Sequence, residues 1–101
     1  MDSNFELADT SLNASFVDYN NTEQIPLNGT YTAPSNGFLA MCGYGSGDVY
    51  IRFTIGEFTI AEQTPHGGNR IHICLPVKKG DTVTISSSIS TVECRVFIPI
   101  G

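Results

Sequence analysis

The side chains in this sequence that have the chemistry of nucleophiles or metal ligands are His66, His72, Cys42, Cys74 and Cys94. His72 and Cys74 lie two residues apart in an alternating apolar run, so on an extended strand they share a face with their bases about 6–7 Å apart. No oxyanion-stabilising motif accompanies this pair, as covalent acyl-transfer chemistry would require. We therefore predict no catalytic residues and no enzymatic activity.

The three cysteines are widely spaced, and each stands inside an apolar run. Zinc sites usually place ligands in close pairs such as C-x2-C, and a disulfide scaffold in a short chain uses an even number of cysteines. A zinc site built from His72 and the three cysteines is an alternative that the sequence leaves open. The pattern favours buried free thiols that pack as small hydrophobic side chains, with no metal and no cofactor.

The charge of the chain disfavours polyanionic partners. Ten acidic residues against five basic ones give a net charge of −5, and the basic residues are scattered along the chain. Nucleic acids and anionic membrane surfaces need a basic stripe, so neither is expected as a partner. No run approaches the ~20 apolar residues of a membrane span. The first residues lack a signal-peptide pattern, and we expect synthesis in a cytoplasm unless the chain is cut from a longer protein.

The elements that must position these side chains are β-strands. Apolar and polar residues alternate with period two over 48–55, 70–75, 81–86 and 91–98, and Gly56-Glu57 separates the first of these runs from 58–61 as a hairpin turn. The run 38–44 is apolar on both faces, which predicts a central or doubly covered strand, and 31–37 is typical of a strand that ends in a turn.

These runs together predict an all-β antiparallel sandwich of seven or eight strands. No helix of ten residues can be placed anywhere in the sequence. We expect residues 1–24 to form an irregular N-terminal segment and residues 25–101 to form the sandwich domain.

The more polar faces of the predicted strands are rich in residue types that favour contact with another protein. In the predicted alternation Phe97 shares its face with Arg95, while Val96 and Ile98 point into the core. A plain solvent face would carry more Lys and Glu, and simple exposure to solvent is the alternative interpretation. The candidate subunit-interface residues are Tyr50, Arg52, His72, Arg95 and Phe97.

Three segments carry a resemblance. Residues 29–39, which read GTYTAPSNGFL, resemble the opening segment of many phage tail-fibre tip and virion spike domains. Residues 75–83, which read LPVKKGDTV, resemble a turn of the same domains and of C1q/TNF-like jelly rolls. The final residues, 96–101, are similar to the terminal strand of such modules. The resemblance covers roughly residues 28–101.

The resemblance implies a jelly-roll sandwich, a homotrimer, a location in the virion, and recognition of a host-surface receptor that is often a saccharide. Two alternatives stay open, namely a structural head-decoration or spike protein and a bacterial C1q/TNF-like adhesin module. Binding sites of such tips usually lie on loops. By residue type and loop placement, the candidate ligand-binding residues are Tyr44, Ser46, Asp48, His66, Asn69 and Arg70.

Overall fold

The computed structural model describes residues 16–65 and 67–100. His66 and the part of the expected N-terminal segment before residue 16 therefore lie outside the described residues. No helix that is long and apolar enough to cross a membrane occurs within these ranges. The strands are β1 (Glu23–Gln24), β2 (Gly29–Thr32), β3 (Gly37–Tyr44), β4 (Val49–Ile55), β5 (Phe58–Thr64), β6 (Ile71–Val77), β7 (Thr82–Ser87) and β8 (Thr91–Pro99).

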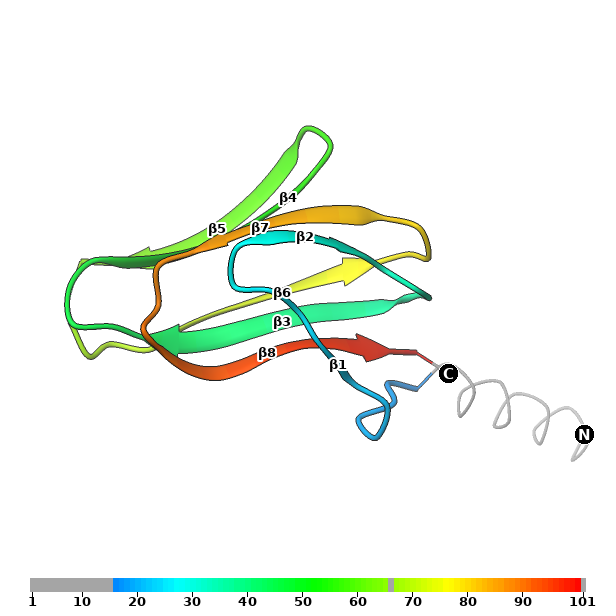
Figure 1. Ribbon diagram of the computed structural model, residues 1–101, viewed down its shortest axis with the longest axis horizontal. Helices are drawn as coiled ribbons and strands as arrows, with labels where there is room; N and C mark the ends of the chain where they lie inside the picture. The colour runs from blue at the N-terminus through cyan, green and yellow to red at the C-terminus, as the bar shows by residue number, and fades with distance from the viewer. Residues whose placement is uncertain (1–15, 66, 101) are drawn as a thin grey trace, which may run out of the picture.

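The eight strands form two four-stranded sheets that pack face to face (Figure 1). Sheet I has the strand order β1-β8-β3-β6, sheet II has the order β2-β7-β4-β5, and every pairing is antiparallel. The chain passes from one sheet to the other at every connection except the β4–β5 hairpin. This is the topology of an eight-stranded jelly roll. The predicted all-β antiparallel sandwich is confirmed.

The turns follow from their local sequence. Gly56 has a φ of +56° at the first central position of the β4–β5 turn, as a two-residue II′ hairpin requires. Between β6 and β7 the Asp81 carboxylate accepts a hydrogen bond from the Lys78 backbone N–H at 2.9 Å, and Gly80 has a φ of +91°. A side chain at either glycine would be strained, so these residue types fix where the chain reverses.

The core lies between the two sheets and consists of the inward residues of alternating strands. Strand β6 shows the pattern most clearly, because Ile71, Ile73, Leu75 and Val77 are buried while the residues between them are exposed. Strand β4 contributes Phe53, which is fully buried. Strand β3 is central in sheet I, as its apolar sequence predicts.

The predicted orientation of β8 is wrong. Phe97 is 1% exposed in the core, with its ring centroid 5.7 Å from that of Tyr31, whereas Val96 and Ile98 are half-buried on the other face of the strand. Both faces of this run carry apolar side chains, so alternation alone does not say which face points inward. The larger aromatic side chain fills the core. Phe97 is therefore not a subunit-interface residue.

The chain before β2 lies along the edge of sheet I. Glu23 and Gln24 pair with Phe97 and Val96 as strand β1, inside the segment expected to be irregular. Val17 forms an isolated bridge with Ile100. This segment therefore supplies the neighbour of β8 on the side away from β3.

Candidate functional site

The outer face of sheet I is apolar and uncharged over the middle of three adjacent strands, and the Arg70–Glu93 ion pair lies at its Tyr44 end. Antiparallel register places side chains of β6, β3 and β8 in rows, and Ala40 lies between Cys74 and Val96 in the middle row. We call this surface the apolar face; its residues are Phe38, Ala40, Cys42, His72, Cys74, Pro76, Cys94, Val96 and Ile98. None of them is Asp, Glu, Lys or Arg. A contiguous apolar patch on an outer surface is a common mark of an interaction site.

All three cysteines are free thiols, as predicted, but they lie on the apolar face and none of them is fully buried, so the predicted burial is wrong. Cys74 is exposed, while Cys42 and Cys94 are half-buried and face each other across β3 and β8. The alternation of β6 and the reversed orientation of β8 are the physical reason, because both put these thiols outside. Burial, together with the hydrogen bond that the Cys94 thiol donates to Cys42, raises the pKa of Cys94 to about 12. Burial also raises the pKa of Cys74.

Register places His72 beside Cys42 and Cys42 beside Cys94 in one row. In the described parts of the chain, no group of three or more His, Cys, Asp or Glu side chains is arranged to hold a metal ion. Neutral thiols are poor nucleophiles and poor metal ligands. The row therefore contributes apolar surface to the face.

The outer face of sheet II is rich in hydroxyl groups. Register aligns Thr30, Thr84, Thr54 and Thr59 in one row across the four strands. The hydroxyls of Thr54 and Thr59 lie 3.0 Å apart, as do those of Thr32 and Thr82. We call this surface the hydroxyl face; its residues are Thr30, Thr32, Thr54, Thr59, Thr82, Thr84 and Ser86.

The structure does not bring the predicted interface residues together. Tyr50 and Arg52 lie on the outer side of sheet II, where the Arg52 guanidinium carbon is 5.1 Å from the Tyr50 ring centroid. His72 lies on the opposite side of the sandwich, on the apolar face. Arg95 is half-buried in β8, and its guanidinium donates to the side-chain oxygen of Gln24.

Two of the loops predicted to bind a ligand meet at one end of the sandwich. The Gly68 backbone N–H donates to the Gly45 carbonyl at 2.7 Å, and a Cβ on Gly67 would stand 2.4 Å from the Ser46 carbonyl oxygen. The Arg70 guanidinium carbon lies 5.1 Å from the Tyr44 ring centroid. The structure thus places the predicted residues Tyr44, Ser46 and Arg70 close together.

These loop side chains are already engaged within the chain. The Arg70 Nε donates to Glu93 Oε1 at 2.8 Å, while its guanidinium covers one face of the Tyr44 ring. Asn69 is exposed. Asp48 lines a pocket beside the start of β4.

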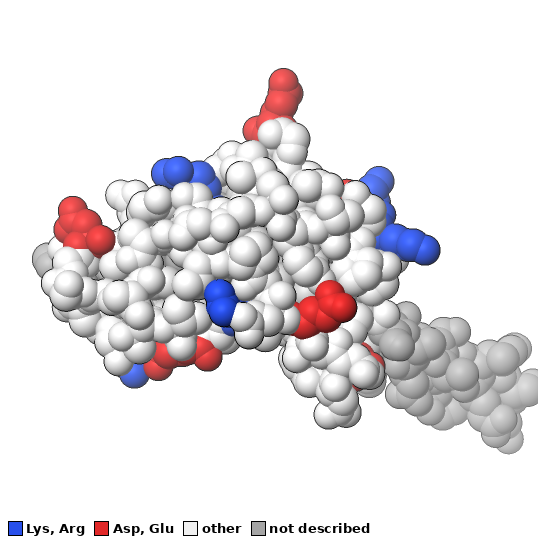
Figure 2. Space-filling model, viewed as in Figure 1, with Lys and Arg blue, Asp and Glu red and all other residues white. Residues whose placement is uncertain are grey.

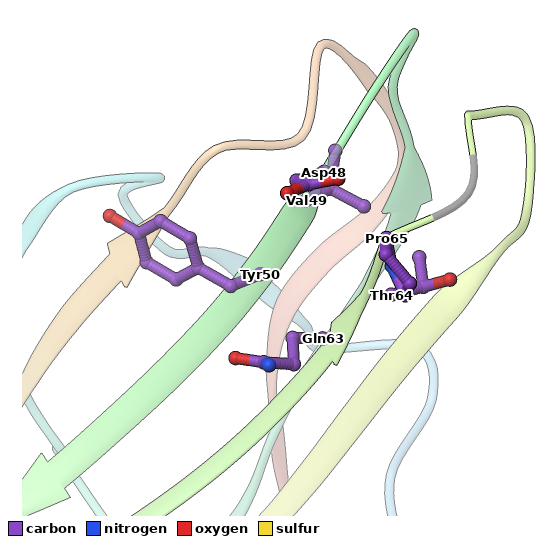
Figure 3. Close-up of a pocket in the computed structure, with 6 residues that line it drawn as sticks. All are labelled: Asp48, Val49, Tyr50, Gln63, Thr64 and Pro65. Carbon is purple, nitrogen blue, oxygen red and sulfur yellow. The ribbon is translucent and has the colours of Figure 1, made fainter.

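A shallow pocket lies between the start of β4 and the end of β5 (Figure 3). It has a volume of about 200 Å³. Of the predicted ligand-binding residues that the structure describes, only Asp48 lines it. The described lining residues are Asp48, Val49, Tyr50, Gln63, Thr64 and Pro65.

Sequence reasoning missed Gln63, although a signal for it was present. Counting outward from the two-residue turn at Gly56-Glu57 pairs Tyr50 with Gln63, and the structure has this pair. The apolar run that predicts this strand spans only 58–61, so it does not by itself include residue 63. Tyr50 itself was assigned to an interface.

Charged side chains are dispersed over the surface that Figure 2 shows, and most of that surface is uncharged. The single ion pair among the described residues is that of Arg70 with Glu93, and both side chains are at least one-third exposed. Exposed pairs of this kind contribute little to stability.

The fold and the two outer faces define a jelly-roll module with one apolar and one hydroxyl-bearing side. No family model matches the chain, and no curated protein sequence matches it. Among solved structures, the chain is similar to the C-terminal domain of A223, a structural protein from Sulfolobus turreted icosahedral virus. The sequence identity is 24% and the TM-score is 0.37, over 82% of this chain and 93% of that one.

Proposed function

We propose that this chain is a non-enzymatic virion or fibre-tip module that assembles as a homotrimer through the apolar face and binds a host-surface receptor. The observation that carries the assembly is the absence of any charged residue from the positions of the apolar face. Interface cores are likewise depleted of charged residues. Water contact with so many apolar side chains is unfavourable by roughly 25 cal/mol per Å².

A second copy of the chain is the occupant that the charge distribution favours. With a net charge of −5, two copies repel each other wherever acidic side chains come close. The apolar face avoids this repulsion, because it presents only uncharged side chains.

The trimer and the virion location are what the resemblance of residues 29–39 and 75–83 implies, and the jelly-roll strand order is compatible with both. A structural decoration protein and a bacterial adhesin module are the alternatives. A decoration protein would share the proposed trimer but would not bind a host-surface receptor.

Light scattering of the purified chain tests the assembly. We expect a mass of three times 10.9 kDa for the natural sequence. Val96→Glu places an unpaired carboxylate in the apolar face, where burial of a lone charge costs about 3–5 kcal/mol, so we expect a monomer. Thr84→Glu is the matched control on the hydroxyl face and keeps the trimer. A monomeric natural chain, or equal masses for the two variants, would overturn the proposal.

Competition with intact particles tests the receptor. Purified trimer is expected to reduce adsorption of the particles to host cells, whereas a decoration protein leaves adsorption unchanged. Unchanged adsorption at saturating trimer contradicts the receptor role and leaves the assembly result standing.

A further inference from the structure

We propose that the pocket between β4 and β5 binds a single neutral sugar ring, with Tyr50 as the contact platform. This inference rests on the proposed receptor-binding function and names the ligand class and the residues. Tyr50 is among the described lining residues of this pocket, whereas Tyr44 is not.

The Tyr50 ring is held in place before any ligand arrives. Its hydroxyl lies 2.9 Å from the Ser86 hydroxyl, and the Arg52 guanidinium carbon lies 5.1 Å from its centroid. The backbone N–H of Tyr50 also donates to the Ser88 hydroxyl at 3.0 Å. A side chain fixed at several points loses little conformational entropy when a ligand binds. Tyr50 is thus a preorganised apolar surface for the C–H groups of a sugar ring.

The polar groups beside Tyr50 match a pattern of neighbouring hydroxyls. Gln63 is directly opposite Tyr50 in the register, and Figure 3 shows the two side chains extending to the same side of the sheet. A carboxamide both donates and accepts hydrogen bonds, and the Asp48 carboxylate accepts them. Sugar hydroxyls do both, so they satisfy both kinds of group.

The charges around the pocket disfavour ionic ligands. Its described lining contains one carboxylate, and the Arg52 guanidinium lies against the Tyr50 ring beside it, so neither sign of charge predominates. A cationic amine would meet the Arg52 guanidinium on the ring that it would need. The volume of about 200 Å³ is below the usual range for drug-sized ligands. A single uncharged polyol ring fits these limits best.

Saturation-transfer NMR tests the pocket, with the methyl glycosides of galactose, glucose, mannose and N-acetylglucosamine as probes. We expect transfer to at least one glycoside, a loss of affinity of at least tenfold in Tyr50→Ala, and a loss of several-fold in Gln63→Ala. Tyr50→Phe keeps the ring and is expected to keep binding. Tyr44→Ala is the matched aromatic control at the neighbouring loops and is expected to bind normally. Circular dichroism verifies that each variant is folded.

Absence of transfer to every glycoside overturns the inference, as does unchanged binding by folded Tyr50→Ala or loss of binding in Tyr44→Ala alone. The outcome is separable from that of the proposed function. Sugar binding that depends on Tyr50 in a chain that is monomeric, or that does not block adsorption, supports the pocket while contradicting the trimer or the receptor role.

Discussion

The outer faces of the two sheets differ in chemistry although they occupy equivalent places in the fold. Strand β3 is central in sheet I and strand β7 is central in sheet II, and both send buried apolar side chains into the same core. Outward, β3 presents Phe38, Ala40 and Cys42, whereas β7 presents Thr82, Thr84 and Ser86. The requirement for a core is met on the inner side of both strands, so the core does not explain this difference.

The hydroxyl face is suited to water. Threonine is favoured in strands, and its hydroxyl forms cross-strand pairs such as that of Thr32 with Thr82. The apolar face has no such groups in its middle row of Cys74, Ala40 and Val96. An antiparallel sheet normally pairs one apolar face with one solvated face. Sheet I departs from this rule, which is why its outer face carries the assembly proposal.

The largest expected effect tests the orientation of β8, on which the apolar face depends. Phe97→Ala removes a ring that is 1% exposed and is expected to lower the free energy of unfolding by about 3–5 kcal/mol. Phe58 is 57% exposed beside the β4–β5 turn, and Phe58→Ala is expected to stay within about 0.5 kcal/mol of the natural chain. Urea unfolding measures both. Equal small losses would place Phe97 outside and remove the apolar face.

The same strand shows where prediction from sequence succeeds and where it stops. In β4 one side of the alternation is clearly polar, and in β6 only one side is aliphatic, so the prediction that Ile51 and Ile73 point inward is confirmed. In β8 both sides carry apolar residues, and neither Val96 nor Phe97 is marked as inner by its type. The choice depends on the space left by Tyr31 and the opposite sheet, which period two does not describe.

The site was predictable in part for a related reason. Loop composition indicated Tyr44 and Arg70, and the structure does place them together. It did not indicate that Glu93, far along the chain, would bind the Arg70 guanidinium. The pairing of Tyr50 with Gln63 follows from the hairpin alone. The fixed position of the Tyr50 ring also depends on the Ser86 hydroxyl from β7. Only the sheet order, which the hairpin does not predict, makes β7 a neighbour of β4.

A second prediction tests whether the apolar face is covered in solution. Cys74 is exposed in the isolated chain, so in the trimer it is expected to react with a maleimide at least tenfold more slowly than in the monomeric Val96→Glu variant. Cys94 is expected to react slowly in both, because its pKa of about 12 keeps it in the thiol form. Peptide mass spectrometry after timed labelling measures each site. Equal Cys74 rates in both proteins would show an uncovered face.

The smallest expected effect concerns the edge where the two sheets are joined. The Tyr31 hydroxyl in sheet II donates to the Glu23 carboxylate in sheet I, and its ring contacts Phe97. Tyr31→Phe removes the hydrogen bond and keeps the ring. We expect a loss of about 1 kcal/mol near pH 8, since the group is only partly buried and solvent weakens the interaction. Urea unfolding of both proteins at several pH values measures it.

The pH dependence of that loss identifies its cause. Burial first, and then the bond to the negatively charged Glu23, raise the pKa of Tyr31, so the folded chain holds the phenol proton more tightly than the unfolded chain. The stability from Tyr31 is therefore complete below the unfolded pKa of about 10 and is lost as the pH rises toward the higher folded value. The difference between the natural chain and Tyr31→Phe should shrink above pH ~10. A difference that stays constant up to pH ~12 would mean that the hydroxyl does not hold the sheets together through Glu23.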